Sequence, residues 1–192
     1  MTYMIISFSG AAGSGKSTIA VRLAKELGWP HYYMGGLRRE AAKRRGITLA
    51  EYNILGETDP STDQEVDEYQ KKLGETDDNF IVEGRTSWYL IPHSLKIYLD
   101  VDENEGIKRI FGHLQQKNER NEDKGLASLA DVKESVKSRL LSDSIRYKKY
   151  YGIDVNDKSQ YDFCLDTTHL NPEEAYQAVY KFVLTNLDNK KN

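Results

Sequence analysis

The sequence has 192 residues and a single cysteine, Cys164. One cysteine excludes an internal disulfide framework and a multi-cysteine metal site, and its place in an apolar run predicts a buried small hydrophobe. No apolar stretch approaches the roughly 20 residues of a membrane span. The beginning of the chain also lacks the basic region and long apolar run of a secretory signal. We therefore expect a cytoplasmic protein with no membrane partner.

Net charge is also small, because 27 Lys and Arg residues stand against 30 Asp and Glu residues, for a formal charge of -3. This balance argues against a protein that coats a nucleic acid polymer. The histidines at 31, 93 and 169 are isolated and poorly spaced for a metal. No internal repeat or linker divides the chain, whose length suits one α/β domain covering residues 1–192.

A glycine-rich stretch near the start of the chain carries the strongest signal. It reads Gly10-Ala11-Ala12-Gly13-Ser14-Gly15-Lys16-Ser17, followed by Thr18. This spacing is the P-loop pattern, in which backbone N–H groups and a helix N-terminus hold a polyphosphate. In that role Lys16 reaches the β- and γ-phosphates and the Ser17 hydroxyl binds Mg²⁺. The alternative is a strand-to-helix turn without a ligand. The apolar run before it and the helical pattern after it favour ATP binding.

The periodicity of the rest of the chain predicts alternating strands and helices, hence an α/β fold. The expected strands cover residues 3–8, 31–34, 80–83, 95–100 and 161–166. The expected helices cover 17–27, 37–45, 105–114, 130–151 and 172–187, with two more inside the polar segment 48–74. Residues 115–125 are almost entirely polar or charged and predict a loop.

Charged residues near the expected strand ends have two interpretations each. The basic helix 37–45 follows a strand that we expect beside the P-loop strand, so its arginines either bind phosphate or form a solvated face. Glu83 ends a strand and suits Mg²⁺ or its waters; otherwise it forms a surface salt bridge. Arg139 and Arg146 lie two helical turns apart and share a helix face. They either belong to a lid that closes on phosphate or keep the surface of the helix soluble.

The reaction class follows from what accompanies the P-loop. GTPases need a guanine-reading Asn-Lys-x-Asp segment, which this sequence lacks, and motor ATPases are usually longer. Several arginines on a small domain fit transfer of a phosphoryl group to a small acceptor, since that reaction depends on positioning and cationic stabilisation. Two alternatives stay open: a non-catalytic ATP-binding module, and a kinase of another small acceptor, such as a different nucleotide, a nucleoside or another metabolite.

Four segments give the sequence a family resemblance over about residues 4–183. They are Gly10–Thr18, Gly35–Glu40, Ile81–Arg85 with Ser87-Trp88, and Arg146–Asp154. With them the chain resembles the nucleoside monophosphate (NMP) kinases, and most closely the short archaeal-type cytidylate kinases. The resemblance implies a five-stranded parallel sheet of order 2-3-1-4-5. It also implies a core (1–35, 76–113, 140–192), an NMP-binding insert at 36–75 and a lid near 114–130.

The same resemblance implies roles for individual residues. Arg39 and Arg85 would hold the acceptor phosphate, while Arg109, Arg139 and Arg146 would neutralise phosphates during transfer. Asp63 or Asp67 would accept a hydrogen bond from the cytosine amino group, and Thr167 and Thr168 would contact the donor adenine. The implied reaction is ATP- and Mg²⁺-dependent phosphorylation of CMP or dCMP. The oligomeric state, monomer or homodimer, stays open.

Two features depart from the family pattern. His113 stands where related kinases often have a second lid arginine, which removes a permanent charge. Thr86-Ser87-Trp88-Tyr89 replaces the usual small apolar residues after Glu83-Gly84-Arg85. Both departures lie close to the expected acceptor, so they bear on the choice between nucleotides.

Overall fold

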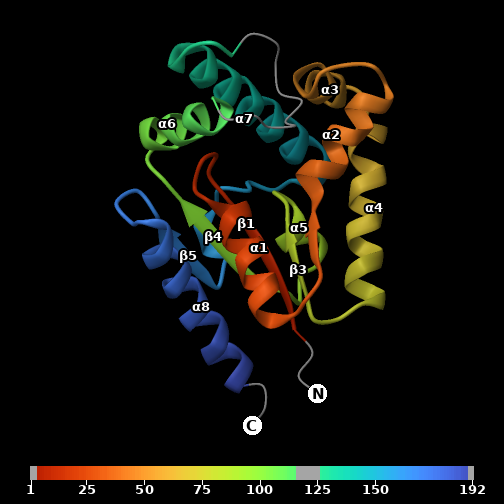
Figure 1. Ribbon diagram of the computed structural model, residues 1–192. Coiled ribbons are helices and arrows are strands. Elements are labelled where there is room, and N and C mark those ends of the chain that lie inside the picture. Colours follow the sequence, from red (N-terminus) through yellow and green to blue (C-terminus); the bar gives the residue numbers. More distant parts are fainter. Residues whose placement is uncertain (1–3, 116–125, 190–192) are drawn as a thin grey trace.

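The sheet and its flanking helices are seen in a computed structural model, which describes residues 4–115 and 126–189. Within these residues a five-stranded parallel sheet has the order β2-β3-β1-β4-β5, which confirms the predicted fold (Figure 1). Its strands are β1 (Ile5–Gly10), β2 (His31–Tyr33), β3 (Phe80–Glu83), β4 (Leu95–Asp100) and β5 (Phe163–Asp166). The register pairs Phe8 with Glu83 and Gly10 with Leu99. The P-loop and Glu83 therefore both lie at the carboxyl ends of the strands.

Apolar side chains from both faces of the sheet are covered by helices. One face packs against α1 (Lys16–Leu27) and α8 (Pro172–Asn189), with Leu23 and Val179 fully buried between them. The other face packs against α2 (Met34–Arg44), α4 (Ser61–Thr76) and the short α5 (Ser87–Leu90). Every residue of β1 and β3 is therefore buried, as expected for parallel strands between two helix layers.

The remaining helices lie at the carboxyl ends of the strands. They are α3 (Leu49–Gly56), α6 (Glu103–Leu114) and α7 (Leu129–Tyr151), with a short 3₁₀ turn, η1, at Lys158–Gln160. Figure 1 shows α6 and α7 at the end of the molecule opposite the two chain termini. Thr48 and Ser128 begin α3 and α7 with capping boxes, which satisfy the free N–H groups of the first turn.

The predicted NMP-binding insert, 36–75, corresponds to most of α2, all of α3 and nearly all of α4. Of the predicted lid, 114–130, residues 116–125 lie outside the described residues, and so does nearly all of the predicted polar loop. The division of the chain into core, insert and lid stays a prediction.

Three local expectations were wrong. The predicted strand 31–34 ends one residue early, because Met34 already begins α2, in which a Cβ on Gly35 would lie 2.7 Å from the Tyr33 ring. β2 lies at the sheet edge and pairs with β3, so it does not neighbour the P-loop strand. Cys164 is exposed, because β5 is the other edge strand and its side chains alternate in exposure.

Candidate active site

A cavity of about 510 Å³ opens where the carboxyl ends of the strands meet α6 and α7. The P-loop from Ala12 to Thr18 forms one side of it, and α2, α4 and the segment after β3 form the other. Ligands of open α/β sheets bind at this edge, outside the carboxyl ends of the strands. The cavity is therefore the candidate active site.

The P-loop is shaped by close contact with the start of α6. Gly13 has φ of 79°, and a Cβ there would lie 2.3 Å from the Gly106 carbonyl oxygen. Gly106 in turn approaches the carbonyl of Ala12, where its own Cβ would lie 2.5 Å away. A left-handed conformation without a side chain is what glycine permits. This contact fixes the position of α6, and with it Arg109, relative to the phosphate cradle.

Lys16 lies folded back on the loop that it follows. Its Nζ donates to the carbonyl oxygens of Gly10 at 2.9 Å and Ala11 at 2.6 Å. Both Lys16 and Ser17 line the cavity. The ammonium group is thus held by neutral acceptors, which a polyphosphate would outcompete because it offers charged oxygens.

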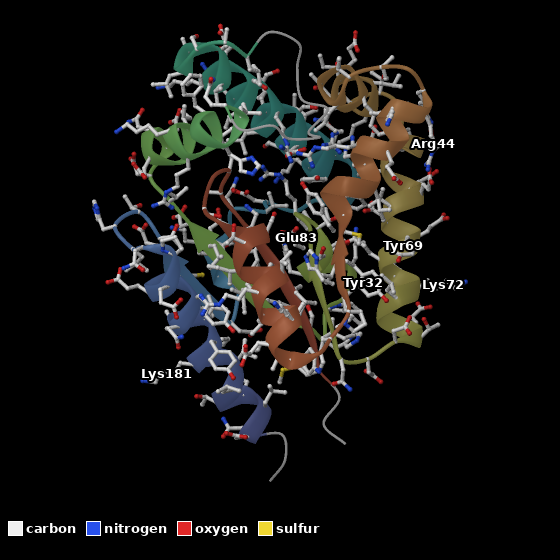
Figure 2. The ribbon with its side chains drawn as sticks, in the orientation of Figure 1. Tyr32, Arg44, Tyr69, Lys72, Glu83 and Lys181 are labelled. Carbon is white, nitrogen blue, oxygen red and sulfur yellow. The ribbon has the colours of Figure 1, made fainter. Side chains whose placement is uncertain are left out.

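Glu83 lies at the end of β3, near the centre of the molecule (Figure 2). It is 3% exposed, lines the cavity, and its Oε1 lacks a hydrogen-bond partner among the described residues. The Nε2 of His31 lies 3.6 Å from that oxygen. A buried carboxylate oxygen without a partner fits a site for Mg²⁺ or a water bound to it.

Metal binding here would rely on the nucleotide as well as the protein. Within residues 4–115 and 126–189 no group of three or more His, Cys, Asp or Glu side chains is arranged to hold a metal ion. Mg²⁺ usually keeps several waters and binds through one or two protein groups plus substrate phosphates. Ser17 and Glu83 suit that arrangement.

Arg109 connects α6 to the loop after β5. Its guanidinium donates to the Thr167 carbonyl at 3.0 Å and the Thr168 carbonyl at 3.1 Å, and Glu105 accepts from its Nε at 3.0 Å. Thr167 in turn donates to the Ser14 carbonyl at 3.2 Å. These bonds join α6, the loop after β5 and the P-loop into one wall of the cavity.

An alternating series of arginines and aspartates lies along the opposite side of the cavity, with Arg146 buried behind the wall. Asp63 accepts from Arg38 at 2.7 Å and from Arg146 at 2.5 Å. Asp143 accepts from Arg146 and forms an ion pair with Arg85 at 2.6 Å. This series therefore ties α2 and α4 to α7 and to the segment after β3.

Arg146 is the buried centre of this network, and its side chain is 0% exposed. Burial lowers the pKa of Arg146, but Tyr147 and the carboxylates of Asp143 and Asp63 outweigh it and raise the pKa above its ordinary value. A permanently charged guanidinium is tolerated here because two carboxylates satisfy it.

A second polar cluster involves Asp67 of α4. Tyr151 donates to its carboxylate, and longer contacts of 3.4 Å and 3.5 Å join Asp67 to Gln70 Nε2 and Thr86 Oγ1. Burial raises the pKa of Asp67 from 3.8 to about 6, with Asp63 adding to the effect and the Tyr151 hydrogen bond opposing it. Burial also raises the pKa of Tyr151, so its hydroxyl stays a donor.

The raised pKa makes Asp67 a source of pH-dependent stability. Because its folded pKa exceeds its unfolded pKa, its stabilising contribution is complete below about pH 4 and is lost as the pH rises through 6. The free energy of unfolding should decline by about 3 kcal/mol in all because of this group, and Asp67→Asn should remove that decline, measured by urea titration between pH 4 and 7. Glu68→Gln, an exposed change on the same helix, should leave the decline intact. An unchanged pH profile in Asp67→Asn would contradict this assignment.

Most of the predicted site residues line this one cavity. They are Ala12, Gly13, Ser14, Gly15, Lys16, Ser17, Thr18, Arg39, Asp63, Asp67, Glu83, Arg85, Arg109, Arg139 and Thr167. The cavity wall does not include Gly10, Ala11, Thr168 or Arg146. Gly10 and Ala11 hold Lys16 through their carbonyls, and Arg146 lies buried behind Asp63 and Asp143.

The arginines of the basic helix 37–45 fall into two groups, one that faces the cavity and one on the solvated surface. Arg38 turns inward to Asp63 and to Asn53 Oδ1, at 2.8 Å, and Arg39 also lines the cavity, next to Tyr33. Arg44 and Arg45 are largely exposed and form surface ion pairs. Only the first turns of the helix therefore serve the cavity.

Sequence reasoning missed three residues of the cavity wall: Arg38 as a specific contact, Asp143, and Gln70. A signal for Asp143 was present, because an acid three residues before Arg146 lies on the same helix face. Gln70 gave none, since it reads as an ordinary polar residue of an exposed helix. His113, the family departure, also lines the cavity.

The sheet order and the central phosphate loop define a P-loop protein with a kinase fold. Among solved structures it is similar to an uncharacterized protein from Eubacterium ventriosum, with a TM-score of 0.68 and 16% identity over 94% of this chain and 98% of that one. It is also similar to shikimate kinase from Bacteroides thetaiotaomicron, with a TM-score of 0.61 and 12% identity over the same shares. At such identities the likeness shows the fold alone.

Sequence comparison is more specific. The model of the cytidylate kinase-like family matches residues 5–169, so the chain belongs to that family. It is 36% identical to the cytidylate kinase of Natronomonas pharaonis over 172 residues, which is 88% of this chain and 84% of the relative. It is 32% identical to the cytidylate kinase of Pyrococcus abyssi over 188 residues, 97% of each chain. Among the described helices, none is long and apolar enough to cross a membrane.

Proposed function

We propose that this protein transfers the γ-phosphoryl group of ATP to the phosphate of CMP or dCMP, giving ADP and CDP or dCDP. Membership of the cytidylate kinase-like family supports the reaction. The observation that carries the proposal is one cavity with two cationic walls, the P-loop on one side and the arginines of α2, α7 and the segment after β3 on the other. Such a cavity suits two phosphorylated substrates at once.

The donor side divides its tasks among a few residues. The backbone of Gly13–Thr18 and the α1 N-terminus bind the β- and γ-phosphates of ATP, and Lys16 leaves its carbonyl acceptors to contact them. Arg109 adds a fixed charge beside the loop that carries Thr167. Ser17 and Glu83 would hold Mg²⁺, which would supply charge neutralisation for the phosphates of ATP.

The acceptor side positions the attacking group. Arg39 and Arg85 bind the CMP phosphate, so that one of its oxygens faces the γ-phosphorus in line with the leaving ADP. The new P–O bond forms at that oxygen while the bond from the γ-phosphorus to the β–γ bridging oxygen breaks. Arg139, which lines the cavity on α7, stabilises the equatorial oxygens. Asp67 accepts from the cytosine amino group, with Asp63 beside it. We also propose that the protein is cytoplasmic, because both substrates are small nucleotides.

An acceptor panel tests this function. ADP formation from ATP and Mg²⁺ is measured by coupled assay with CMP, dCMP, UMP, AMP, GMP and shikimate in turn. We expect CMP and dCMP to give the highest kcat/KM values, at least about 100-fold above shikimate, because only a nucleotide offers the arginines a phosphate. Omitting the acceptor gives the background ATPase rate. ADP formation that no acceptor stimulates would refute the proposal.

A further inference from the structure

The segment that departs from the family pattern, Thr86 to Tyr89, begins beside the proposed acceptor site. Gln70 and Thr86 line the cavity next to Asp67, and these three residues form what we call the base recess. Ser87 lies directly behind Gln70 and is fully buried, while Gln70 is 1% exposed. Polar side chains buried to this degree bind one another or a ligand.

The amide of Gln70 is held in one orientation from both sides. Its Oε1 accepts from the Ser87 hydroxyl at 2.6 Å, and its Nε2 faces Asp67 Oδ1 at 3.4 Å. Turning the amide over would set Oε1 against a carboxylate oxygen, which has no proton to give when ionised. Ser87 and Asp67 together therefore fix Nε2 on the Asp67 side.

The recess consequently offers an acceptor beside a donor. The Nε2 atom carries two hydrogens, and the long contact with Asp67 uses one of them at most. The contacts from Gln70 and Thr86 to Asp67 Oδ1, at 3.4 Å and 3.5 Å, are long enough for a ligand to replace. A ligand edge that fits must present a donor to Asp67 and an acceptor to Gln70.

We propose that Gln70, held in place by Ser87, is a specificity-determining residue that selects a 4-amino pyrimidine over a 4-oxo pyrimidine. This inference rests on the proposed function. Cytosine presents an amino donor next to the N3 acceptor, which matches Asp67 and Gln70. Uracil presents a carbonyl acceptor next to an N3–H donor, which opposes both. Since turning the amide over would set its Oε1 against the ionised Asp67 carboxylate, the mismatch leaves buried polar groups unpaired.

Two variants of the wild-type protein test the inference through the ratio of kcat/KM for CMP to that for UMP. We expect the wild-type ratio to exceed about 100, because unpaired polar groups reject the wrong base. Ser87→Ala removes the hydrogen bond that anchors Gln70, so Nε2 is no longer held toward the base, and the ratio should fall at least about tenfold, mainly by lowering kcat/KM for CMP. Gln70→Met removes the donor and should lower kcat/KM for CMP by about tenfold or more.

Ser94→Ala is the matched control. Ser94 is also buried, but its hydroxyl bonds Ser7 and the Ile91 carbonyl, away from the base recess, so its loss should leave the ratio unchanged. A wild-type protein that phosphorylates CMP and UMP equally well would overturn the inference, as would Ser87→Ala and Gln70→Met variants that keep the wild-type ratio. In both cases the proposed function would stand. Absence of turnover with every nucleotide would instead refute the proposed function itself.

Discussion

Lys16→Ala is expected to lower acceptor-dependent ADP formation by at least about 100-fold, the scale for removing one group that stabilises the transition state. The Lys16 ammonium lies at the phosphate cradle, where it donates to the backbone carbonyls of Gly10 and Ala11. Removing it takes away the cation that would contact the β- and γ-phosphates. The rate with CMP and ATP measures the effect.

The matched control for this change is Lys25→Ala, an exposed lysine in the last turn of the same helix. It should keep the wild-type rate, and both variants should keep the wild-type melting temperature within a few degrees. A Lys16→Ala protein that is folded and retains full turnover would contradict the role given to the P-loop.

Arg146→Ala is expected to have the largest effect on stability, a loss of about 3–5 kcal/mol in the free energy of unfolding. Its guanidinium is completely buried between Asp63 and Asp143, so truncation leaves two buried carboxylates that share their remaining arginines, Arg38 and Arg85. Urea titration followed by circular dichroism measures the loss.

Arg44→Ala supplies the comparison, because Arg44 also pairs with an acid, Glu65, but both side chains are more than half exposed. Exposed pairs contribute little, so this variant should fall within about 0.5 kcal/mol of wild type. If Arg146→Ala were no less stable than Arg44→Ala, the buried network would not join α2, α4 and α7 as described.

Much of the fold was predictable because its signals are local. The strands at 80–83 and 95–100 have the predicted bounds, since each is a short apolar run ended by an acid. The P-loop pattern located the donor cradle, and Asn171 before Pro172 located the start of α8, where its side chain accepts from two backbone N–H groups. The sheet order came from the family resemblance and not from periodicity.

What escaped prediction depends on contacts distant in sequence. Cys164 looked like a core residue because an apolar run does not reveal that its strand lies at the sheet edge. Helical spacing placed Arg146 on a face of its helix but did not indicate that Asp63 and Asp143 cover it, and its role toward phosphate stays a prediction.

The most direct test of the central claim follows the γ-phosphate itself. The protein is incubated with Mg²⁺, CMP and ATP labelled at the γ-phosphate, and the labelled products are separated. Transfer between nucleotides predicts that the label leaves ATP only when an acceptor is present and is recovered in CDP. Label recovered as inorganic phosphate, or retained in ATP whichever nucleotide is added, would contradict the account.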